Sequence, residues 1–342
     1  MAGSAAHAAP RGRDLDHNHH HPVPPIAVDM SGNEPSLAYE TRLGRMYQAT
    51  IEEFLTSPTG ANATGTVQML FTSPPFPLNR KKRYGNHKGE EYLEWFVSLA
   101  DSFRNLLMPD GSVVVEMGNA WEPGRPIMST LALRALLGFL DKGQFVLCQQ
   151  FVCHNPARLP TPTQWVNVDR IRVKDSFTHI WWMATSDRPK ANNRRVLRPY
   201  SDAMRELLRR GTYNTTKRPS QHSIGKTSFL KDNGGSIPSN VLEISNTASS
   251  DDYLEYCRQN TIQVHPARMQ PSLAEFFVKF LTDEGDLVFD PFAGSNTTGA
   301  AAERLGRHWI AVETREDYVM GSAGRFGDGA VLHPVPEAGR HP

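Results

Sequence analysis

The sequence predicts an α/β fold with a mostly parallel sheet and helices on both of its faces. Short β-prone runs alternate with helical periodicity up to residue 152 and again after residue 264. Several of the β-prone runs are continuously apolar, which is typical of parallel strands covered on both faces. The stretch 153–264 is rich in Asn, Ser, Gly, Pro and Arg and interrupts this alternation, so we expect an inserted region there.

The first half of the chain supplies most of the predicted sheet. Apolar residues in the segment 90–107 recur at spacings of three and four, which predicts a helix with one apolar face. Pro109-Asp110-Gly111 then indicates a turn. A second helix is expected near 129–140. The predicted strands lie at 66–71, 112–117, 145–152 and 178–184.

The last part of the chain repeats the alternation. Pro271 is typical of the first turn of a helix, and an apolar face follows it as far as Leu281. A strand at 287–289, a glycine-containing loop, a helix near 300–305 and a strand at 308–313 complete the series. Residues 1–35 lack apolar periodicity and are predicted to be a disordered tail, and 327–342 a loose one.

The charge of the chain is unevenly distributed. The 342 residues carry a formal net charge of only +1. Residues 151–240 nevertheless sum to +10, against −2 before them and −7 after them, and such asymmetry points to a polyanionic partner. No apolar run is long enough for a membrane helix. The three cysteines match no zinc pattern or disulfide framework, so we expect no metal and a cytoplasmic protein.

The first motif follows a predicted strand and opens a helix. It comprises Asp290, Pro291, Phe292, Ala293, Gly294 and Ser295 and continues to Gly299. Glycines let the backbone approach a ligand closely, and the helix start offers free amides. Glu313 ends the next predicted strand, where a carboxylate can accept hydrogen bonds from ribose hydroxyls. The motif has neither the Walker nor the dinucleotide spacing, so a nucleoside cofactor without pyrophosphate is predicted.

The second motif, Ser73-Pro74-Pro75-Phe76, lies at the carboxyl end of another predicted strand. Ligands of open α/β sheets bind beyond these strand ends. The two prolines stiffen the backbone, which holds the Pro74 carbonyl and the Ser73 hydroxyl in fixed directions. Phe76 offers a flat face for stacking. This combination suits a planar group that carries an exocyclic amine.

Together the two motifs resemble those of the amino-methylating DNA methyltransferases that use S-adenosylmethionine. In that family an Asp-x-Phe-x-Gly-x loop holds the cofactor and a Ser/Asp/Asn-Pro-Pro-Tyr/Phe motif holds the target amine. The catalytic motif precedes the cofactor motif here, which matches the permuted β-class order. His265-Pro266-Ala267-Arg268 and the helix after it resemble the additional cofactor-side motif of that class.

The similarity is closer to the cytosine-N4-specific members and spans roughly residues 40–326. Glu116 stands where the similar cytosine-N4-specific sequence carries Asp. Ala49 stands where such enzymes often have an acidic residue. The resemblance implies a Rossmann-like methyltransferase fold with a mostly parallel seven-stranded sheet. The segments that carry it are 76–86, 164–167, 170–175, 231–238 and 294–299.

The resemblance also implies direct methyl transfer to the exocyclic amine of a flipped-out base. Ser73 and Pro74 would accept hydrogen bonds from the amine, Pro75 would stiffen the motif, Phe76 would stack on the base, and Glu116 would lie near the reactive centre. The cofactor would be held by the loop 290–295 with Glu313, His265 and Pro266. No metal is implied, and Ser before Pro-Pro favours cytosine N4.

The positively charged stretch 151–240, the basic block, is interpreted as the DNA-binding part of this enzyme. The residues expected to face double-stranded DNA are Arg80, Lys81, Lys82, Arg83, Arg170, Arg172, Lys174, Arg194, Arg195, Lys217, Arg218, Lys226 and Lys231. The domain boundaries that follow are a catalytic half at 36–152, a target-recognition region at 153–264 and a cofactor-binding half at 265–326. A monomer is expected, with a cognate restriction endonuclease as a companion of the system.

Three alternatives remain open at the level of sequence. The first is an adenine-N6 DNA methyltransferase of the same fold, because both target amines need the same acceptors. The second is a catalytically inactive DNA-binding module, and the third is an RNA methyltransferase. The exact DNA site cannot be inferred from residue spacing.

Overall fold

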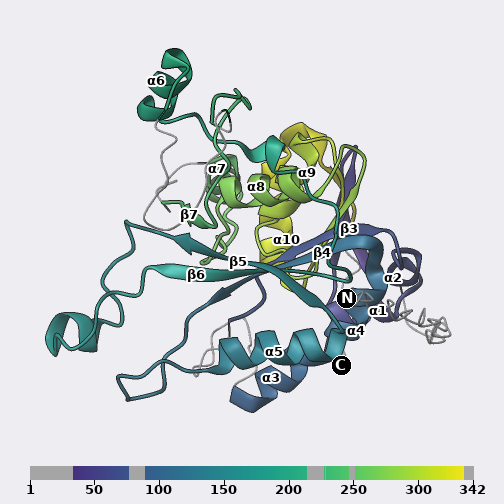
Figure 1. Cartoon of the computed structure of the whole chain (residues 1–342). Coiled ribbons are helices and arrows are strands. Elements are labelled where there is room, and N and C mark those ends of the chain that lie inside the picture. Colours follow the sequence, from purple (N-terminus) through teal and green to yellow (C-terminus); the bar gives the residue numbers. More distant parts are fainter. Residues whose placement is uncertain (1–33, 77–88, 214–226, 228, 246–250, 335–342) are drawn as a thin grey trace, which may run out of the picture.

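A ten-stranded sheet forms the centre of the computed structural model, which describes residues 34–76, 89–213, 227, 229–245 and 251–334 (Figure 1). Its strand order is β10-β1-β2-β9-β8-β3-β4-β6-β5-β7. The strands are β1 (Ser36–Glu40), β2 (Gly44–Gln48), β3 (Val67–Thr72), β4 (Leu107–Gly118), β5 (Val146–His154), β6 (Phe177–Ala184), β7 (Val241–Glu243), β8 (Leu287–Asp290), β9 (His308–Glu313) and β10 (Val331–Leu332).

The α/β class is confirmed, but the expectation of seven strands is wrong. Five neighbouring pairs of the ten strands are parallel and four are antiparallel. The parallel core β2-β9-β8-β3-β4 is joined to an antiparallel β1–β10 edge on one side. On the other side β6 lies antiparallel between β4 and β5. The unpredicted strands β1, β2, β7 and β10 have five residues or fewer, so their sequence signal is weak.

Helices cover both faces of the sheet (Figure 1). On one face, apolar side chains of α1, α3, α4 and α5 pack into a core in which Phe96 and Phe139 stack at 4.9 Å. On the other face, α8, α9 and α10 enclose a second core around Phe277. The helices are α1 (Ile51–Thr56), α2 (Pro58–Asn62), α3 (Gly89–Ser98), α4 (Ala100–Leu106), α5 (Leu131–Gly143), α6 (Asp202–Arg210), α7 (Asp252–Gln259), α8 (Pro271–Leu281), α9 (Thr297–Arg304) and α10 (Glu316–Ser322). Within the described ranges, no helix is long and apolar enough to cross a membrane.

Two local predictions in the first half need correction. The segment 90–107 forms the two helices α3 and α4 instead of one, and Leu107 already belongs to β4. The turn at Pro109-Asp110-Gly111 lies inside β4, where Val67 pairs with Leu107 but Met69 pairs with Ser112. The turn residues are therefore accommodated as an irregularity of the strand.

The predicted boundaries of the middle and final segments also differ from the structure. Strand β6 falls within 153–264, yet it pairs with β4 and β5 in the central sheet and Trp181 is fully buried there. Helix α7 packs against α10 and the turn at 323–325. Residues 327–334, predicted as part of a loose tail, include β10, which pairs with β1. The remainder of both predicted tails, 1–33 and 335–342, lies outside the described residues.

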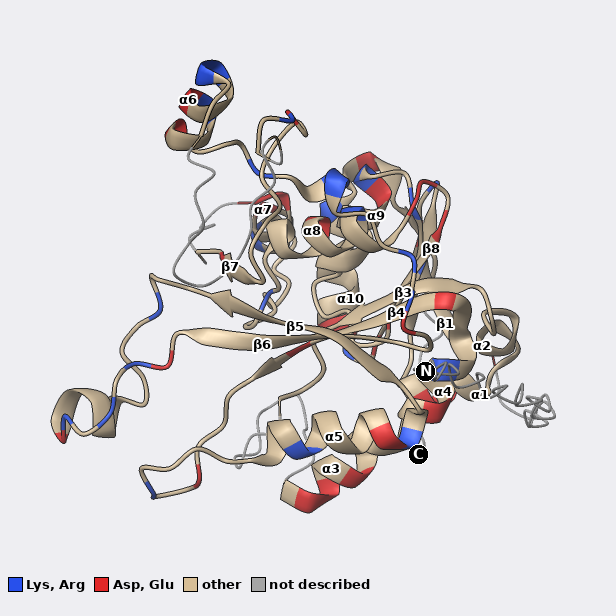
Figure 2. Ribbon diagram, viewed as in Figure 1, with Lys and Arg blue, Asp and Glu red and all other residues tan. Residues whose placement is uncertain are grey.

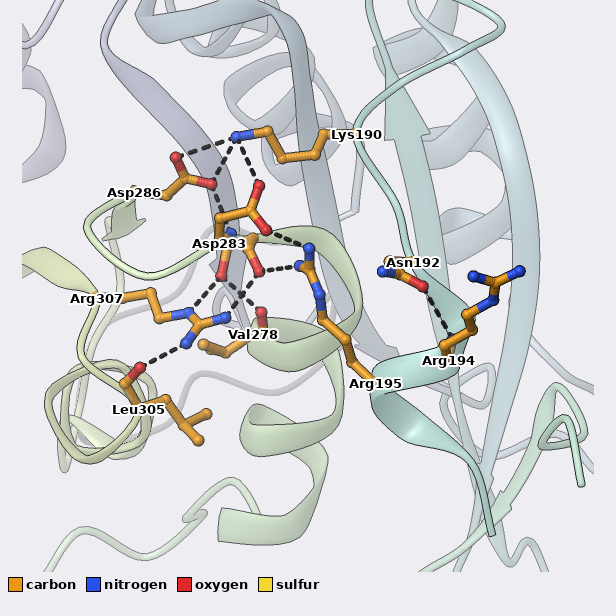
Figure 3. Close-up of polar contacts among 10 residues, drawn as sticks. Lys190, Asn192, Arg194, Arg195, Val278, Asp283, Asp286, Leu305 and Arg307 are labelled. Atoms are coloured by element: carbon orange, nitrogen blue, oxygen red, sulfur yellow. Dashed lines mark hydrogen bonds and ion pairs between the residues drawn. The ribbon is translucent and has the colours of Figure 1, made fainter. Parts of the chain in front are cut away.

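An ion-pair cluster anchors the segment after β6 at the amino end of β8 (Figure 3). Lys190 Nζ lies 2.8 Å from Asp286 Oδ2 and 3.4 Å from Asp283 Oδ2, and Arg195 pairs with Asp283. Arg195, which we expected to face DNA, has its guanidinium held between Asp283 and the Thr282 carbonyl. Arg194 points away from this cluster (Figure 3).

Candidate active site

A cavity of about 370 Å³ opens where the parallel core strands end. Because β2, β9, β8, β3 and β4 are parallel neighbours, their carboxyl ends meet at one edge of the sheet. The volume is within the range of small-ligand and cofactor sites. The lining residues are Thr50, Ile51, Glu52, Ser73, Pro74, Pro75, Phe76, Trp95, His265, Ala267, Met269, Asp290, Pro291, Phe292, Ala293, Gly294, Ser295, Thr297, Thr298, Glu313, Thr314 and Tyr318.

Both predicted motifs therefore contribute to the same cavity. The predicted catalytic motif 73–76 follows β3, and the loop 290–295 follows its sheet neighbour β8. Thr72 Oγ1 donates to Asp290 Oδ1 at 2.8 Å, which joins the two strand ends directly. Two segments more than 200 residues apart in sequence thus form one site.

Asp290 is the buried polar centre of this junction. Its Oδ1 also accepts the Phe292 backbone amide at 3.2 Å, which fixes the turn that leaves β8. Burial raises the pKa of Asp290 to about 6, although hydrogen bonds from Thr298, Thr72 and Phe292 act in the opposite direction. Keeping the buried Asp290 side chain ionised at neutral pH therefore lowers the free energy of unfolding.

Asp290→Asn should raise the free energy of unfolding by up to about 3 kcal/mol at pH 7.5, because an amide keeps the acceptor without the buried charge. The folded pKa lies above the unfolded value of 3.8, so the wild type regains stability as the pH falls through 6. The difference in the free energy of unfolding between the variant and the wild type should drop at pH 5 to about half of its value at pH 7.5. Urea unfolding at both pH values measures it, and a difference that does not vary with pH would contradict this account of the pKa.

The loop turns sharply at Gly294 and Asn296, which have φ values of +52° and +50°. An ideal Cβ on Gly294 would lie 3.0 Å from His265 Nε2, so glycine also leaves room for the imidazole. Asn296 caps α9 through its side chain, which accepts the Gly299 amide at 3.1 Å. The loop is thereby held in one backbone conformation at the start of the helix.

Glu313 ends β9 on the opposite side of the loop. Its Oε2 accepts the Gly294 amide at 2.9 Å, and its Oε1 accepts the Arg315 amide at 3.0 Å. Burial raises the pKa of Glu313, and these backbone hydrogen bonds partly offset the shift. An acceptor group fixed at the cavity wall in this way can bind ligand hydroxyls.

His265 faces Gly294 from the segment before α8. Its ring lies edge-on to Tyr318 with centroids 4.5 Å apart, and Nδ1 accepts the Ala267 amide at 3.3 Å. Burial lowers the pKa of His265 to about 4, so the imidazole is neutral at physiological pH. Pro266, which we also expected to contact the cofactor, is exposed and is not part of the cavity lining.

The catalytic motif rests on the end of β4. The Phe76 ring packs over Gly118, where an ideal Cβ would lie 2.5 Å from a ring carbon. Glu116, two residues earlier, accepts Thr178 Oγ1 at 3.0 Å and a hydrogen bond from the Ser73 side chain. Burial raises the pKa of Glu116 despite these bonds. Glu116 does not line the cavity, so it touches the site through Ser73.

Several residues of the site carried no recognisable sequence signal. Glu52 Oε1 accepts Trp95 Nε1 at 2.7 Å, which links α1 to α3 at the rim of the cavity. Arg325 donates to Ser295 Oγ at 3.1 Å and lies 4.9 Å from the Tyr253 ring. Residues 50–52 follow the unpredicted strand β2, and recognising that strand would have indicated them.

The predicted DNA-binding residues are only partly placed. Arg80, Lys81, Lys82, Arg83, Lys217, Arg218 and Lys226 lie outside the described residues. Arg170 and Lys231 are exposed. Arg172 Nε donates to the Pro126 carbonyl at 3.0 Å, and Lys174 Nζ to the Pro156 carbonyl at 2.9 Å. Figure 2 shows Lys and Arg positions, coloured blue, on the loop between β5 and β6 and on α6.

Among the residues that the structure describes, no group of three or more His, Cys, Asp or Glu side chains is arranged to hold a metal ion. All three cysteines are free.

The comparisons with known sequences agree on one class of protein. A family model, N6_N4_Mtase, described as DNA methylase, matches residues 67–323. The Type II methyltransferase M.PvuII of Proteus hauseri is 45% identical over 299 residues, which cover 87% of this chain and 87% of that protein. The Type II methyltransferase M.BglII of Bacillus subtilis is 23% identical over 85% of this chain and 71% of that protein.

Solved structures show the same fold. The PvuII DNA methyltransferase, named as cytosine-N4-specific, matches with a TM-score of 0.68 and 38% identity, over 85% of this chain and 89% of that one. A protein from Thermus thermophilus in complex with S-adenosyl-L-methionine matches with a TM-score of 0.50 and 19% identity, over 85% of this chain and 94% of that one. At that level of identity the second likeness concerns the fold alone.

Proposed function

This chain belongs to the DNA methylase family whose model matches residues 67–323, and we propose that it methylates N4 of cytosine in a short double-stranded DNA site. The methyl donor in this proposal is S-adenosyl-L-methionine. One observation carries the proposal: Ser73-Pro74-Pro75-Phe76 and the loop 290–295 line one cavity at adjacent strand ends. The 45% identity to M.PvuII, whose solved counterpart is named cytosine-N4-specific, supports the choice of target atom.

The residues of the cavity fit this cofactor. The missing Cβ of Gly294 leaves a cradle beside His265 Nε2, and Glu313 offers carboxylate oxygens for ribose hydroxyls. The neutral His265 adds no positive charge to the cavity that would oppose binding of a cationic cofactor. When bound, S-adenosyl-L-methionine supplies a methyl group activated by that sulfonium. The residues proposed to hold it are Asp290, Pro291, Phe292, Ala293, Gly294, Ser295, Glu313 and His265.

The catalytic motif would hold the target amine. Because the Ser73 hydroxyl donates to Glu116, its oxygen lone pairs are left to accept from an N–H group. The Pro74 carbonyl supplies a second acceptor, and Phe76 a ring on which cytosine stacks. Two acceptors orient the amine, so catalysis rests mainly on positioning. Glu116 acts as a positioning residue behind Ser73.

A base paired in a duplex cannot present its amine to these acceptors. The proposal therefore includes base flipping, which costs a few kcal/mol of unstacking. The DNA is held by the target-recognition region 153–264, from which β6 and β7 are excepted as strands of the central sheet. Arg170 and Lys231 are among its exposed basic residues in the described part. The halves 36–152 and 265–326 supply the amine-binding and cofactor-binding sides.

The proposal extends to the oligomeric state, the enzyme system and the cellular compartment. In this proposal the enzyme works as a monomer. It belongs to a restriction-modification system, as the names of the Type II relatives imply for those proteins. Free cysteines favour a reducing, cytoplasmic compartment.

Methylation of a mixed-sequence duplex library, mapped at single-base resolution, tests this function. We expect modified cytosines confined to one short sequence. Modified adenines would favour the N6-specific alternative. Titration calorimetry with S-adenosyl-L-methionine separates an enzyme from an inactive DNA-binding module, because only the module would bind DNA without binding the cofactor.

A further inference from the structure

A chain of side-chain hydrogen bonds runs from β5 to the loop between β5 and β6. Gln150 Nε2 lies 3.2 Å from His179 Nδ1, and His179 Nε2 lies 2.9 Å from Asn119 Oδ1. Asn119 Nδ2 then donates to Asp175 Oδ1 at 2.8 Å. Asp175 is almost the last residue of the loop 155–176, which we call the β5–β6 loop. Four side chains thus connect the sheet to this loop.

The direction of each hydrogen bond follows from the chemistry of its partners. The carboxylate of Asp175 only accepts, so the Asn119 amide nitrogen must face it and the Asn119 oxygen must face His179. His179 Nε2 therefore carries the proton and donates. His179 Nδ1 is left as the acceptor of the Gln150 amide. Burial lowers the pKa of His179, which favours the neutral ring that this arrangement requires.

The Asn119 end of the chain lies against the catalytic motif. Asn119 directly follows Gly118, and the Phe76 ring packs on the Gly118 backbone. The register of β6 places Thr178 beside Gly118 and His179 beside Met117. The end of β4 therefore has Phe76 on one side and the hydrogen-bonded chain on the other.

The Asp175 end holds a loop with exposed basic and apolar side chains. Arg170 is exposed with φ +55°, and Val173 is 87% exposed. The Trp165 ring lies 5.3 Å from Trp121, which belongs to the segment after β4. Exposed guanidinium groups beside apolar side chains are suited to DNA phosphates and grooves. The position of this loop relative to Phe76 would set the distance between bound DNA and the base pocket.

We propose that Asn119, His179 and Asp175 are positioning residues that hold the β5–β6 loop in register with the base-stacking Phe76. The inference rests on the proposed function, because it assigns the loop to DNA. DNA gripped by the loop and a base flipped onto Phe76 must fit one geometry. Without these side-chain hydrogen bonds, the loop would bind DNA in positions that do not deliver the base to Phe76. Productive DNA binding would then weaken.

Asp175→Ala and Asp175→Asn form a matched pair, since both remove the charge but only asparagine keeps an acceptor for Asn119. For Asp175→Ala we expect KM for DNA to rise about 10-fold, with kcat and the Kd of S-adenosyl-L-methionine unchanged. Asp175→Asn should restore KM to within about 2-fold of wild type. Equal KM values for the two variants, or a fall of kcat and cofactor affinity together, would overturn the inference.

His179→Gln and His179→Ala provide a second pair. The glutamine amide can replace Nε2–H as the donor to Asn119, whereas alanine cannot. KM for DNA should again rise about 10-fold only in the alanine variant. Thermal unfolding of every variant checks that the fold persists. If the wild type transfers no methyl group to cytosine, the proposed function fails. If it does, and the two variants within each pair give equal KM values for DNA, only this inference fails.

Discussion

Ser73→Ala is expected to lower kcat by about 100-fold while leaving the Kd of S-adenosyl-L-methionine within about 2-fold of wild type. The Ser73 hydroxyl is one of two acceptors proposed for the amine, and Glu116 fixes its direction. Its removal leaves the Pro74 carbonyl alone, so the amine lone pair is no longer held toward the methyl group. The cofactor loop after β8 is untouched by the substitution.

Single-turnover kinetics and calorimetry measure the two quantities separately. Ser102→Ala, on α4 and outside the cavity, is the matched control and should behave as wild type. Equal losses of turnover and cofactor affinity in Ser73→Ala would mean that the amine site is assigned wrongly.

Gly294→Ala should have the complementary effect, raising the Kd of S-adenosyl-L-methionine by about 10- to 100-fold. At φ +52° alanine is strained, and its Cβ would lie 3.0 Å from His265 Nε2. Either the backbone relaxes and weakens the amide hydrogen bond to Glu313, or the imidazole shifts within the cavity. Both outcomes disturb groups proposed to hold the cofactor.

Gly327→Ala is a stringent control for this variant. Gly327 has the same φ of +52°, yet nothing lies within 4 Å of its ideal Cβ. The control should therefore lose a similar amount of stability to backbone strain without losing cofactor affinity. A normal cofactor Kd in Gly294→Ala, measured by calorimetry, would contradict the assignment of the loop.

Much of the fold could be predicted because its strands are buried and its helices are strongly periodic. The run before Thr72 is wholly buried as β3, and α8 begins at the predicted Pro271. The edge strand β10 has two residues, and β1 is ordered through pairing with both β2 and β10. Pairing between distant short segments depends on tertiary contacts that leave little local pattern.

The residues of the candidate site likewise divide into those that the sequence predicts and those that it does not. The two motifs were recognisable because each is a continuous run with unusual residues, and both line the cavity. The support under them was not recognisable. Gly118 carries the Phe76 ring and Arg325 holds Ser295, but a glycine at a strand end and an isolated arginine are common features. Similarly, Arg195 belonged to the basic block but pairs with Asp283, which the total charge could not reveal.

Transfer of radioactive methyl from S-adenosyl-L-methionine to duplex DNA, followed by digestion and chromatography of the nucleosides, tests the central claim most directly. The cavity formed by Ser73–Phe76 and the loop 290–295 predicts label in N4-methylcytosine, and its loss in Ser73→Ala. Label in N6-methyladenine, or no label in DNA from a protein that binds the cofactor, would contradict the claim.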